Sequence, residues 1–211
     1  MMSEEERRKR ELEKLRECVE RCKRCPLHAM RKNVVVGEGS AVAELMMIGE
    51  APGYNEDLQG RPFVGKAGKV LDSLLQSIGL DRASVYICNV LKCRPPKNRE
   101  PSKHEIAQCT PFLDEQISII KPRIIATLGN YSMQYIFSKY NIPISKISEI
   151  HGSVYKVSTL EGSIFIVPLY HPAVAVYNIK MMDVLLEDFK VIQMIMMNNK
   201  NRLISAKKSI K

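Results

Sequence analysis

The chain has 211 residues, 45% of them hydrophobic, and no Pro-, Gly- or Ser-rich linker divides it, so we expect a single domain over residues 1–211. Lysine and arginine outnumber aspartate and glutamate by 32 to 23, and the formal net charge of +9 favours a polyanionic partner. No apolar run reaches the length of a membrane span and the N-terminus is charged throughout, which argues against a transmembrane or secreted protein and favours a cytoplasmic one.

The first predicted element is an exposed amphipathic helix over Glu4–Glu20, and Pro26 ends the helical segment. After a turn at Gly37–Ser40, the continuous apolar run Leu45–Ile48 predicts a short buried strand. Beyond this strand, apolar runs continue to alternate with amphipathic helices, which is the pattern of an α/β fold.

A long connection follows the first strand, and helical spacing resumes only from Lys66 to Leu75. Glycines account for tight turns in it, but it also holds three acids and one aromatic residue: Glu50, Glu56, Asp57 and Phe63. Ordinary connections have about two to six residues, and ligands bind beyond the carboxyl ends of strands in open parallel sheets. We therefore expect a binding pocket here.

A second strand is predicted at Val85–Val90, with Asn89 near its end. It leads into a rigid basic loop, Lys92–Arg99, that contains two consecutive prolines. Ser102 followed by Glu105 has the spacing of a helix N-terminus, and this helix is predicted to extend to about Ile120.

The C-terminal part of the chain continues the same alternation. Strands are predicted at Ile124–Leu128 and, as a pair around Gly162, at Val154–Val157 and Ile164–Val167. Helices are predicted from about Tyr131 and from about Asp183 to Met197. Residues from about 199 to 211 are basic and poorly patterned, and we expect a disordered tail there.

Cysteines in a cytoplasmic chain of this size are better explained as metal ligands or core residues than as disulfides. Cys22 and Cys25 form a CxxC pair, and Cys93 and Cys109 lie across the basic loop. Four thiolates from two segments can bind a tetrahedral zinc ion or a four-iron cluster, and spacing alone does not distinguish them. Cys88 lies within a predicted strand, where we expect a buried, inert thiol.

Three motifs and the cysteines occur together in a specific order. They are Gly49-Glu50-Ala51-Pro52-Gly53 with Glu56-Asp57 and Gly60–Gly65, Asn89 within Cys88–Pro96, and His171-Pro172-Ala173. From Cys22 to about Tyr177 the chain resembles the family 4 uracil-DNA glycosylases. The resemblance implies a three-layer α/β/α sandwich with a central four-stranded parallel sheet. It also implies a structural [4Fe–4S] cluster held by four cysteines: Cys22, Cys25, Cys93 and Cys109.

The resemblance implies a monofunctional DNA glycosylase, which hydrolyses the N-glycosidic bond of a flipped-out deoxyuridine and leaves an abasic site. Asn89 would bond to N3–H and O4 of uracil, rejecting cytosine, whose donor and acceptor are exchanged there. Phe63 would stack on the ring, and His171 would donate to O2 of the departing anion. Backbone amides at Glu50 and Ala51 would assist. No lysine lies within the matched pocket motifs, which argues against a lyase.

The position of Ala51 differs from other uracil-DNA glycosylase families, which carry Asp or Asn there to orient the attacking water. Because Ala51 offers only a methyl group, another residue must handle the water, and Glu50 and Glu56 are the nearest carboxylates. We hypothesise that Glu50 activates the water or stabilises the cationic sugar and that Glu56 assists. The candidate catalytic residues are therefore Glu50, Glu56 and His171.

We expect the partner to be uracil-containing DNA, single- or double-stranded. A base inside a duplex must be extruded to reach such a pocket. Three basic-loop residues are placed to contact phosphates: Arg94, Lys97 and Arg99. Val174 or Val176 is expected to be the apolar wedge that fills the gap left by the flipped base. We expect a monomer, and contact of the basic tail with a sliding clamp is left open.

Three alternatives are kept. A relative that binds uracil-containing DNA, or reacts covalently with it, would share the motifs but not turn over. A zinc or iron–sulfur nucleic-acid-binding module would share the charge and the cysteines, without needing Asn89, Phe63 and His171 together. Finally, Cys18 extends Cys22 and Cys25 to CxxxCxxC, which resembles the cluster motif of radical S-adenosylmethionine enzymes.

Overall fold

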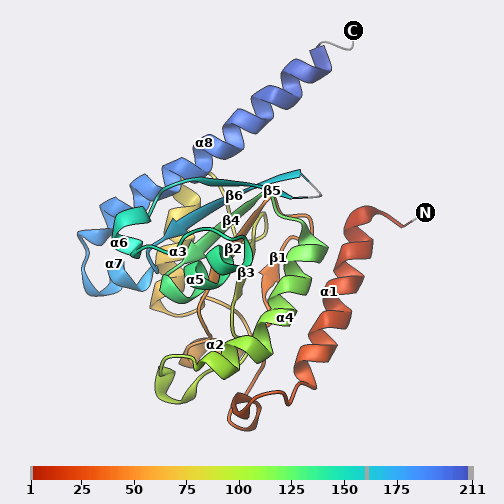
Figure 1. The fold of residues 1–211 in the computed structure, drawn as a ribbon, viewed down its shortest axis with the longest axis vertical. Coiled ribbons are helices and arrows are strands. Elements are labelled where there is room, and N and C mark those ends of the chain that lie inside the picture. Colours follow the sequence, from red (N-terminus) through yellow and green to blue (C-terminus); the bar gives the residue numbers. More distant parts are fainter. Residues whose placement is uncertain (1, 160–161, 209–211) are drawn as a thin grey trace.

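Within residues 2–159 and 162–208, which the computed structural model describes with side chains up to residue 197, a six-stranded mixed sheet forms the centre of the protein (Figure 1). The strand order is β1-β3-β2-β4-β6-β5. The four central strands are parallel, as predicted: β3 (Tyr86–Asn89), β2 (Leu45–Gly49), β4 (Ile124–Leu128) and β6 (Gly162–Leu169).

Two antiparallel strands extend the predicted four-stranded sheet at its edges. β5 (Tyr155–Thr159) pairs with β6 around Gly162, which confirms the predicted pair. β1 (Glu38–Gly39) lies where the sequence predicted only a turn, because two residues are too few to show an alternating pattern.

Helices cover both faces of the sheet, which gives the three-layer α/β/α arrangement (Figure 1). They are α1 (Glu4–Glu20), α2 (Tyr54–Gln59), α3 (Lys66–Ser77), α4 (Lys103–Ile120), α5 (Asn130–Lys139), α6 (Ile147–Ile150), α7 (Ala173–Tyr177) and α8 (Met181–Lys208). Short 3₁₀ helices η1 (Pro26–Ala29) and η2 (Pro96–Asn98) lie in the connections.

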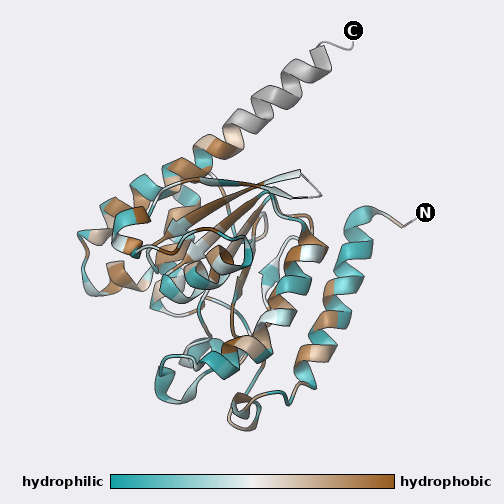
Figure 2. Ribbon diagram, viewed as in Figure 1, coloured by the Kyte–Doolittle hydropathy of each residue, from teal (hydrophilic) through white to brown (hydrophobic). Residues whose placement is uncertain are grey.

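The core consists of two apolar layers, one on each side of the sheet, and the central strands are mostly brown, the hydrophobic end of the scale, in Figure 2. Successive strand residues point to opposite faces. Met47 of β2 therefore packs toward α3 and α8, whereas its neighbour Met46 packs toward α4 and α5. Burial on both faces explains why these strands are continuous apolar runs.

Helix α1 packs along α4 rather than on the sheet (Figure 1). Its N-terminus is capped by Ser3, whose hydroxyl accepts from the Glu6 amide while the Glu6 carboxylate accepts from the Ser3 amide. Leu15 and Val19 are buried against Phe112 of α4. The end of α1 is thereby brought next to the basic loop and Cys109.

Two segments differ from the prediction. The connection after β2 was predicted to lack regular structure, yet it contains α2. Helix α8 continues to Lys208, beyond the predicted end at Met197. The tail expected to be disordered covers about residues 199–211. Its last three residues and all of its side chains lie outside the described part of the chain, so its disorder stays a prediction. No helix in the described part of the chain is long and apolar enough to cross a membrane.

Candidate active site and cysteine cavity

A pocket of about 400 Å³ opens at the carboxyl edge of the parallel strands, where β2, β3 and β6 end. The structure brings together at this pocket all six residues that the sequence singled out as catalytic or uracil-binding: Glu50, Ala51, Glu56, Phe63, Asn89 and His171. They come from three distant segments of the chain. The parallel strands that precede these segments lie close together in the sheet, so their carboxyl ends meet at one edge, where the pocket forms.

Asn89 is the last residue of β3 and lies beside Gly49 of β2 in the parallel register. Only 2% of Asn89 is exposed, and its side-chain amide has no hydrogen-bond partner among the described residues. A Cβ atom on Gly49 would lie 2.4 Å from Asn89 Oδ1 and 2.6 Å from Phe63 Cζ. Glycine at position 49 therefore allows the amide and the aromatic ring to meet at the pocket.

Phe63 has a φ of 51°, a left-handed conformation that is strained for a bulky residue. Hydrogen bonds on both sides of this residue hold the turn. The Val64 and Gly65 amides each donate to Glu56 Oε1 over 2.9 Å. Arg82 donates to the Pro62 carbonyl over 2.5 Å and to the Phe63 carbonyl over 3.1 Å. No pattern in the sequence indicated this role of Arg82, which follows α3 in the chain.

His171 follows β6 and lies against Phe63, with the ring centroids 5.6 Å apart and the planes at 27°. The backbone amide of Ala173 donates to His171 Nδ1 over 3.2 Å. Burial of the imidazole lowers the pKa of His171 to about 4, and the charge of Glu56 opposes this shift only in part. The imidazole is therefore neutral at physiological pH.

Glu50 begins the connection after β2, and its carbonyl accepts from the Leu91 amide over 2.9 Å. Its half-buried side chain lines the pocket without a hydrogen-bond partner among the described residues. Burial raises the pKa of Glu50, and the nearby charge of Glu100 raises it further. A carboxylate in this setting takes up a proton more readily than an ordinary glutamate.

The three basic-loop residues predicted to contact DNA differ in their position relative to the pocket. Arg99 lines the pocket, but its guanidinium forms an ion pair with the buried Glu105, with contacts of 2.6 and 2.9 Å. Arg94 donates to Asn98 over 2.7 Å and lies over the Tyr54 ring, 5.0 Å from its centroid. Lys97 is exposed at the rim, and Arg94 and Lys97 do not line the pocket itself.

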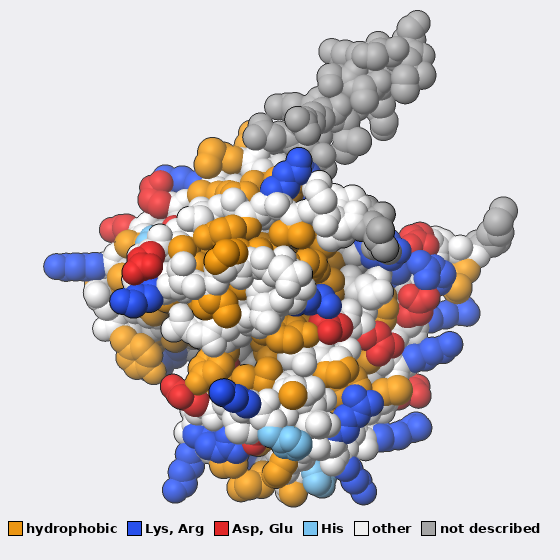
Figure 3. All heavy atoms as spheres, in the orientation of Figure 1, with side chains coloured by type: hydrophobic (Ala, Val, Ile, Leu, Met, Phe, Trp, Pro, Cys, Tyr) orange, Lys and Arg blue, Asp and Glu red, His pale blue; other side chains and the backbone are white. Residues whose placement is uncertain are grey.

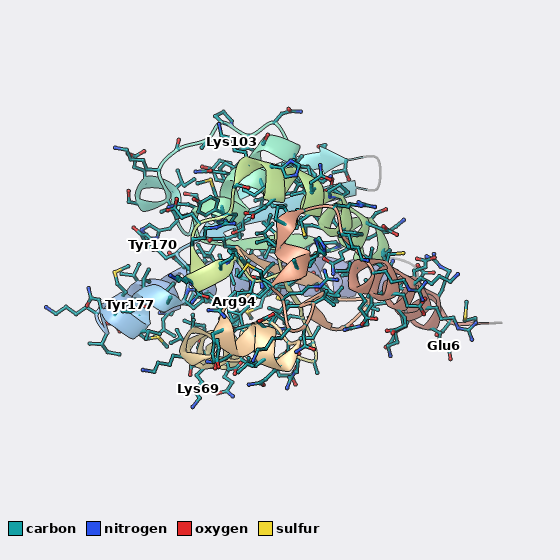
Figure 4. All side chains as sticks on the ribbon, turned by 90° about the horizontal axis from the view of Figure 1, so that it is seen from below. Glu6, Lys69, Arg94, Lys103, Tyr170 and Tyr177 are labelled. Atoms are coloured by element: carbon teal, nitrogen blue, oxygen red, sulfur yellow. The ribbon has the colours of Figure 1, made fainter. Side chains whose placement is uncertain are left out.

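Lysine and arginine side chains project at the lower left and lower right of the molecule in Figure 3, with hydrophobic and histidine side chains between them, and α2 and the start of α4 lie at this lower edge (Figure 1). Figure 4 views this edge from below, with Arg94 near the middle and Tyr177 at one side. The basic loop and its contacts with phosphates stay a prediction for this edge.

The segment after His171 forms α7, and this helix decides which side chains reach solvent. Val174 packs against the apolar core and Val176 is half-buried, so neither projects freely. The exposed apolar residues are Tyr177, which is 90% exposed, and Ile179, which is 79% exposed. The sequence prediction missed both, because a five-residue helix is too short to show a periodic pattern.

The four cysteines expected to be ligands line one small cavity between the end of α1, the loop after β3, and α4. The Lys92 amide donates to Cys109 Sγ and the Arg31 guanidinium to Cys93 Sγ, each over 3.2 Å. Burial raises the pKa of Cys109 to about 11, so its thiolate needs a cation beside it. Among the described residues, no three potential ligand side chains are arranged to hold a single metal ion.

The remaining cysteines lie elsewhere. Cys88 is fully buried in β3, as expected for an inert core thiol. Cys18 is exposed on α1 and does not line the cavity, so the triplet of Cys18, Cys22 and Cys25 does not face a common space. This arrangement disfavours the interpretation as a radical S-adenosylmethionine motif.

Comparisons with known proteins assign the chain to a family. The sequence profile of the uracil DNA glycosylase superfamily matches residues 36–190. The type-4 uracil-DNA glycosylase of Sulfurisphaera tokodaii is 50% identical over 183 residues, which cover 86% of this chain and 83% of the relative. That of Saccharolobus solfataricus is 47% identical over 83% of this chain and 82% of the relative, and that of Archaeoglobus fulgidus is 43% identical over 81% and 86%. With such matches over most of both chains, this protein belongs to the type-4 family of uracil-DNA glycosylases.

Proposed function

We propose that this protein removes uracil from DNA by hydrolysing the N-glycosidic bond and leaves an abasic site. The observation that carries the proposal is the meeting of a free amide, an aromatic ring and a neutral imidazole in one pocket: Asn89, Phe63 and His171. A flipped pyrimidine needs these three functions, which are edge recognition, stacking and stabilisation of the leaving anion.

The reaction divides among the pocket residues as follows. The C1′–N1 bond breaks, and its electron pair leaves with the base, whose O2 accepts a hydrogen bond from Nε2–H of His171. Water adds to C1′, and its proton passes to the Glu50 carboxylate, whose raised pKa suits a base. A cationic sugar forms as the bond breaks, so the carboxylate also stabilises it electrostatically.

Glu56 has a different part in this proposal from the assisting catalytic role that the sequence suggested. Its Oε1 atom accepts two backbone hydrogen bonds, from the Val64 and Gly65 amides. We assign it to positioning Phe63, because an oxygen occupied in this way is poorly placed to take a proton from water.

Contacts with DNA are proposed to come from Lys97 at the rim, from Arg94 beside Tyr54, and from α7. We propose that Tyr177, rather than Val174 or Val176, fills the space left by the flipped base. The 90% exposure of Tyr177 and its position six residues after His171 support this choice. Arg99 would serve mainly to hold the loop, through its ion pair with Glu105.

The cysteine cavity is proposed to hold a [4Fe–4S] cluster with a structural role. Four thiols face it, and four basic side chains also line it, which suits an anionic metal–thiolate centre: Arg24, His28, Arg31 and Lys92. When bound, such a cluster would link α1 to the loop after β3 and to α4.

The decisive experiment uses an oligonucleotide with one uracil and, as control, the same strand with cytosine. After incubation and alkaline treatment, cleavage at the uracil alone is expected, with Asn89→Ala strongly impaired. Intact uracil strands would overturn the proposal, and cleavage without alkali would indicate a lyase instead. Iron and sulfide analysis with a visible absorption spectrum tests the cluster, with Cys25→Ser expected to lose it and Cys18→Ser to keep it.

A further inference from the structure

Lys92 is a fully buried lysine, with 0% of its surface exposed. Its ammonium donates to the carbonyl of Asn89 and to Oε1 of Gln116, each over 2.6 Å. Both acceptors are neutral, and no carboxylate pairs with this ammonium in the described part of the chain. Lysines are almost never fully buried without an opposite charge, so this residue needs an explanation.

Gln116 of α4 keeps the lysine in place. It is also 0% exposed, and its Nε2 group donates to the Val36 carbonyl over 2.8 Å and to the Tyr86 hydroxyl over 3.0 Å. Every polar atom of the Gln116 side chain therefore has a partner, and such a satisfied buried network has one arrangement. The lysine ammonium is fixed relative to the sheet.

The same residue belongs to the cysteine cavity. Lys92 lines this cavity, its amide donates to Cys109 Sγ, and Cys93 follows it directly in the chain. At its other end, the Asn89 carbonyl that it holds belongs to the residue whose amide faces the pocket. Lys92 thus connects the cavity, through its backbone amide, with the residue proposed to recognise uracil, through its ammonium.

We propose that Lys92 is a positioning residue through which the metal centre in the cysteine cavity controls the placement of Asn89. The inference rests on the proposed function and on the proposed cluster. Thiolates of the loaded centre supply the negative charge that the buried ammonium lacks, and the ammonium in turn fixes the end of β3 through the Asn89 carbonyl. Loss of the centre removes the counter-charge and frees this end of the strand.

The first test is Lys92→Met, which keeps the length of the side chain and removes its donors. Single-turnover uracil release is expected to slow on the order of 10²-fold at saturating enzyme, because misplacement of a recognising group by about 1 Å costs that much. Iron content and visible absorption per chain give the fraction of each protein that holds the cluster, and the rates of the variant and the wild type are compared per cluster-containing protein. Lys190→Met on α8, an exposed lysine paired with Glu187, is the matched control and is expected to match the wild type.

The second test needs no variant and keeps the inference testable if Lys92→Met does not fold. Amide hydrogen exchange is measured for the full wild-type chain before and after chelation of the metal. The Val90 and Leu91 amides, which donate to the Gly49 and Glu50 carbonyls, are expected to exchange at least tenfold faster after chelation, while amides of β4 are unchanged.

The outcomes separate the two proposals. If the wild type releases no uracil, the proposed function fails. If the wild type is active but exchange at Val90 and Leu91 does not respond to chelation, or loaded Lys92→Met is as fast as the wild type, the inference about Lys92 is overturned and the proposed function stands.

Discussion

The backbone amide of Ala173 donates to Nδ1 of His171 over 3.2 Å, which fixes the tautomer of the imidazole. A nitrogen that accepts a hydrogen bond carries no proton, so the neutral ring holds its hydrogen on Nε2. Since burial lowers the pKa of His171 to about 4, the ring enters the reaction as a neutral donor and not as an imidazolium.

We predict that His171→Ala lowers kcat for uracil release by about 10² to 10³-fold, as expected for removal of one donor to a developing oxyanion. In the wild type, ¹⁵N NMR at pH 6 should show a neutral His171 with its proton on Nε2. An imidazolium signal at that pH would contradict the assignment.

We predict that activity falls on acidification through the titration of Glu50. Burial raises the pKa of Glu50, so its carboxyl gains a proton at a higher pH than an ordinary glutamate does. The active carboxylate is present above this pKa and is lost as the pH falls through it. His171 stays neutral in this range, because its pKa is lower, near 4. This acidic fall in rate is measured as the single-turnover rate constant against pH. Glu50→Gln should be slow at every pH and should not show the fall. If Glu50→Gln still shows it, the titration belongs to another group.

The two roles considered for Glu56 predict different relative activities for the variants Glu56→Gln and Glu56→Ala. If Glu56 positions Phe63, Glu56→Gln should stay within a few fold of the wild type, because the amide oxygen still accepts from Val64 and Gly65. Glu56→Ala should be slower on the order of 10²-fold, since the left-handed turn at Phe63 loses its support. Equal losses in both variants would instead point to a proton-transfer role.

We predict that Tyr177→Ala lowers the rate on duplex DNA at least tenfold and leaves single strands nearly unaffected, because only a duplex has a gap to fill. Stacking of about 1 to 3 kcal/mol per base gives this scale. Val174→Ala is the matched control. It should keep the ratio of duplex to single-strand activity and lower the free energy of unfolding by about 1 to 2 kcal/mol, as two buried carbons are lost. Loss of duplex activity in Val174→Ala alone would restore the valine as the wedge.

The predictability of the fold from the sequence follows from how each element is buried. β2 and β4 are covered on both faces, so continuous apolar runs revealed them. α2 was missed because it has six residues, begins at Gly53 without a side-chain cap and exposes Leu58, so it lacks an apolar stripe. β1 was missed because it has two residues.

The site was predictable where chemistry is carried by unusual residues in motifs, as for Asn89, Phe63 and His171. It was not predictable where an ordinary basic residue is turned inward. Lys92 is the first residue of the basic loop that was expected to hold the DNA strand, and only the folded chain shows it buried, with its ammonium bonded to the Asn89 carbonyl. Arg82 likewise gave no local signal for its contacts with Pro62 and Phe63, since these span about twenty residues.

Gly49 has a consequence for attempts to redesign the specificity of this protein. Any side chain there would collide with both the amide of Asn89 and the ring of Phe63, so the position cannot be varied to reshape the floor of the pocket. A mutant library aimed at larger or differently substituted bases should hold this glycine constant. Diversity belongs instead at the walls, at Ala67 and Ala173, where methyl groups already line the cavity and can be enlarged or removed.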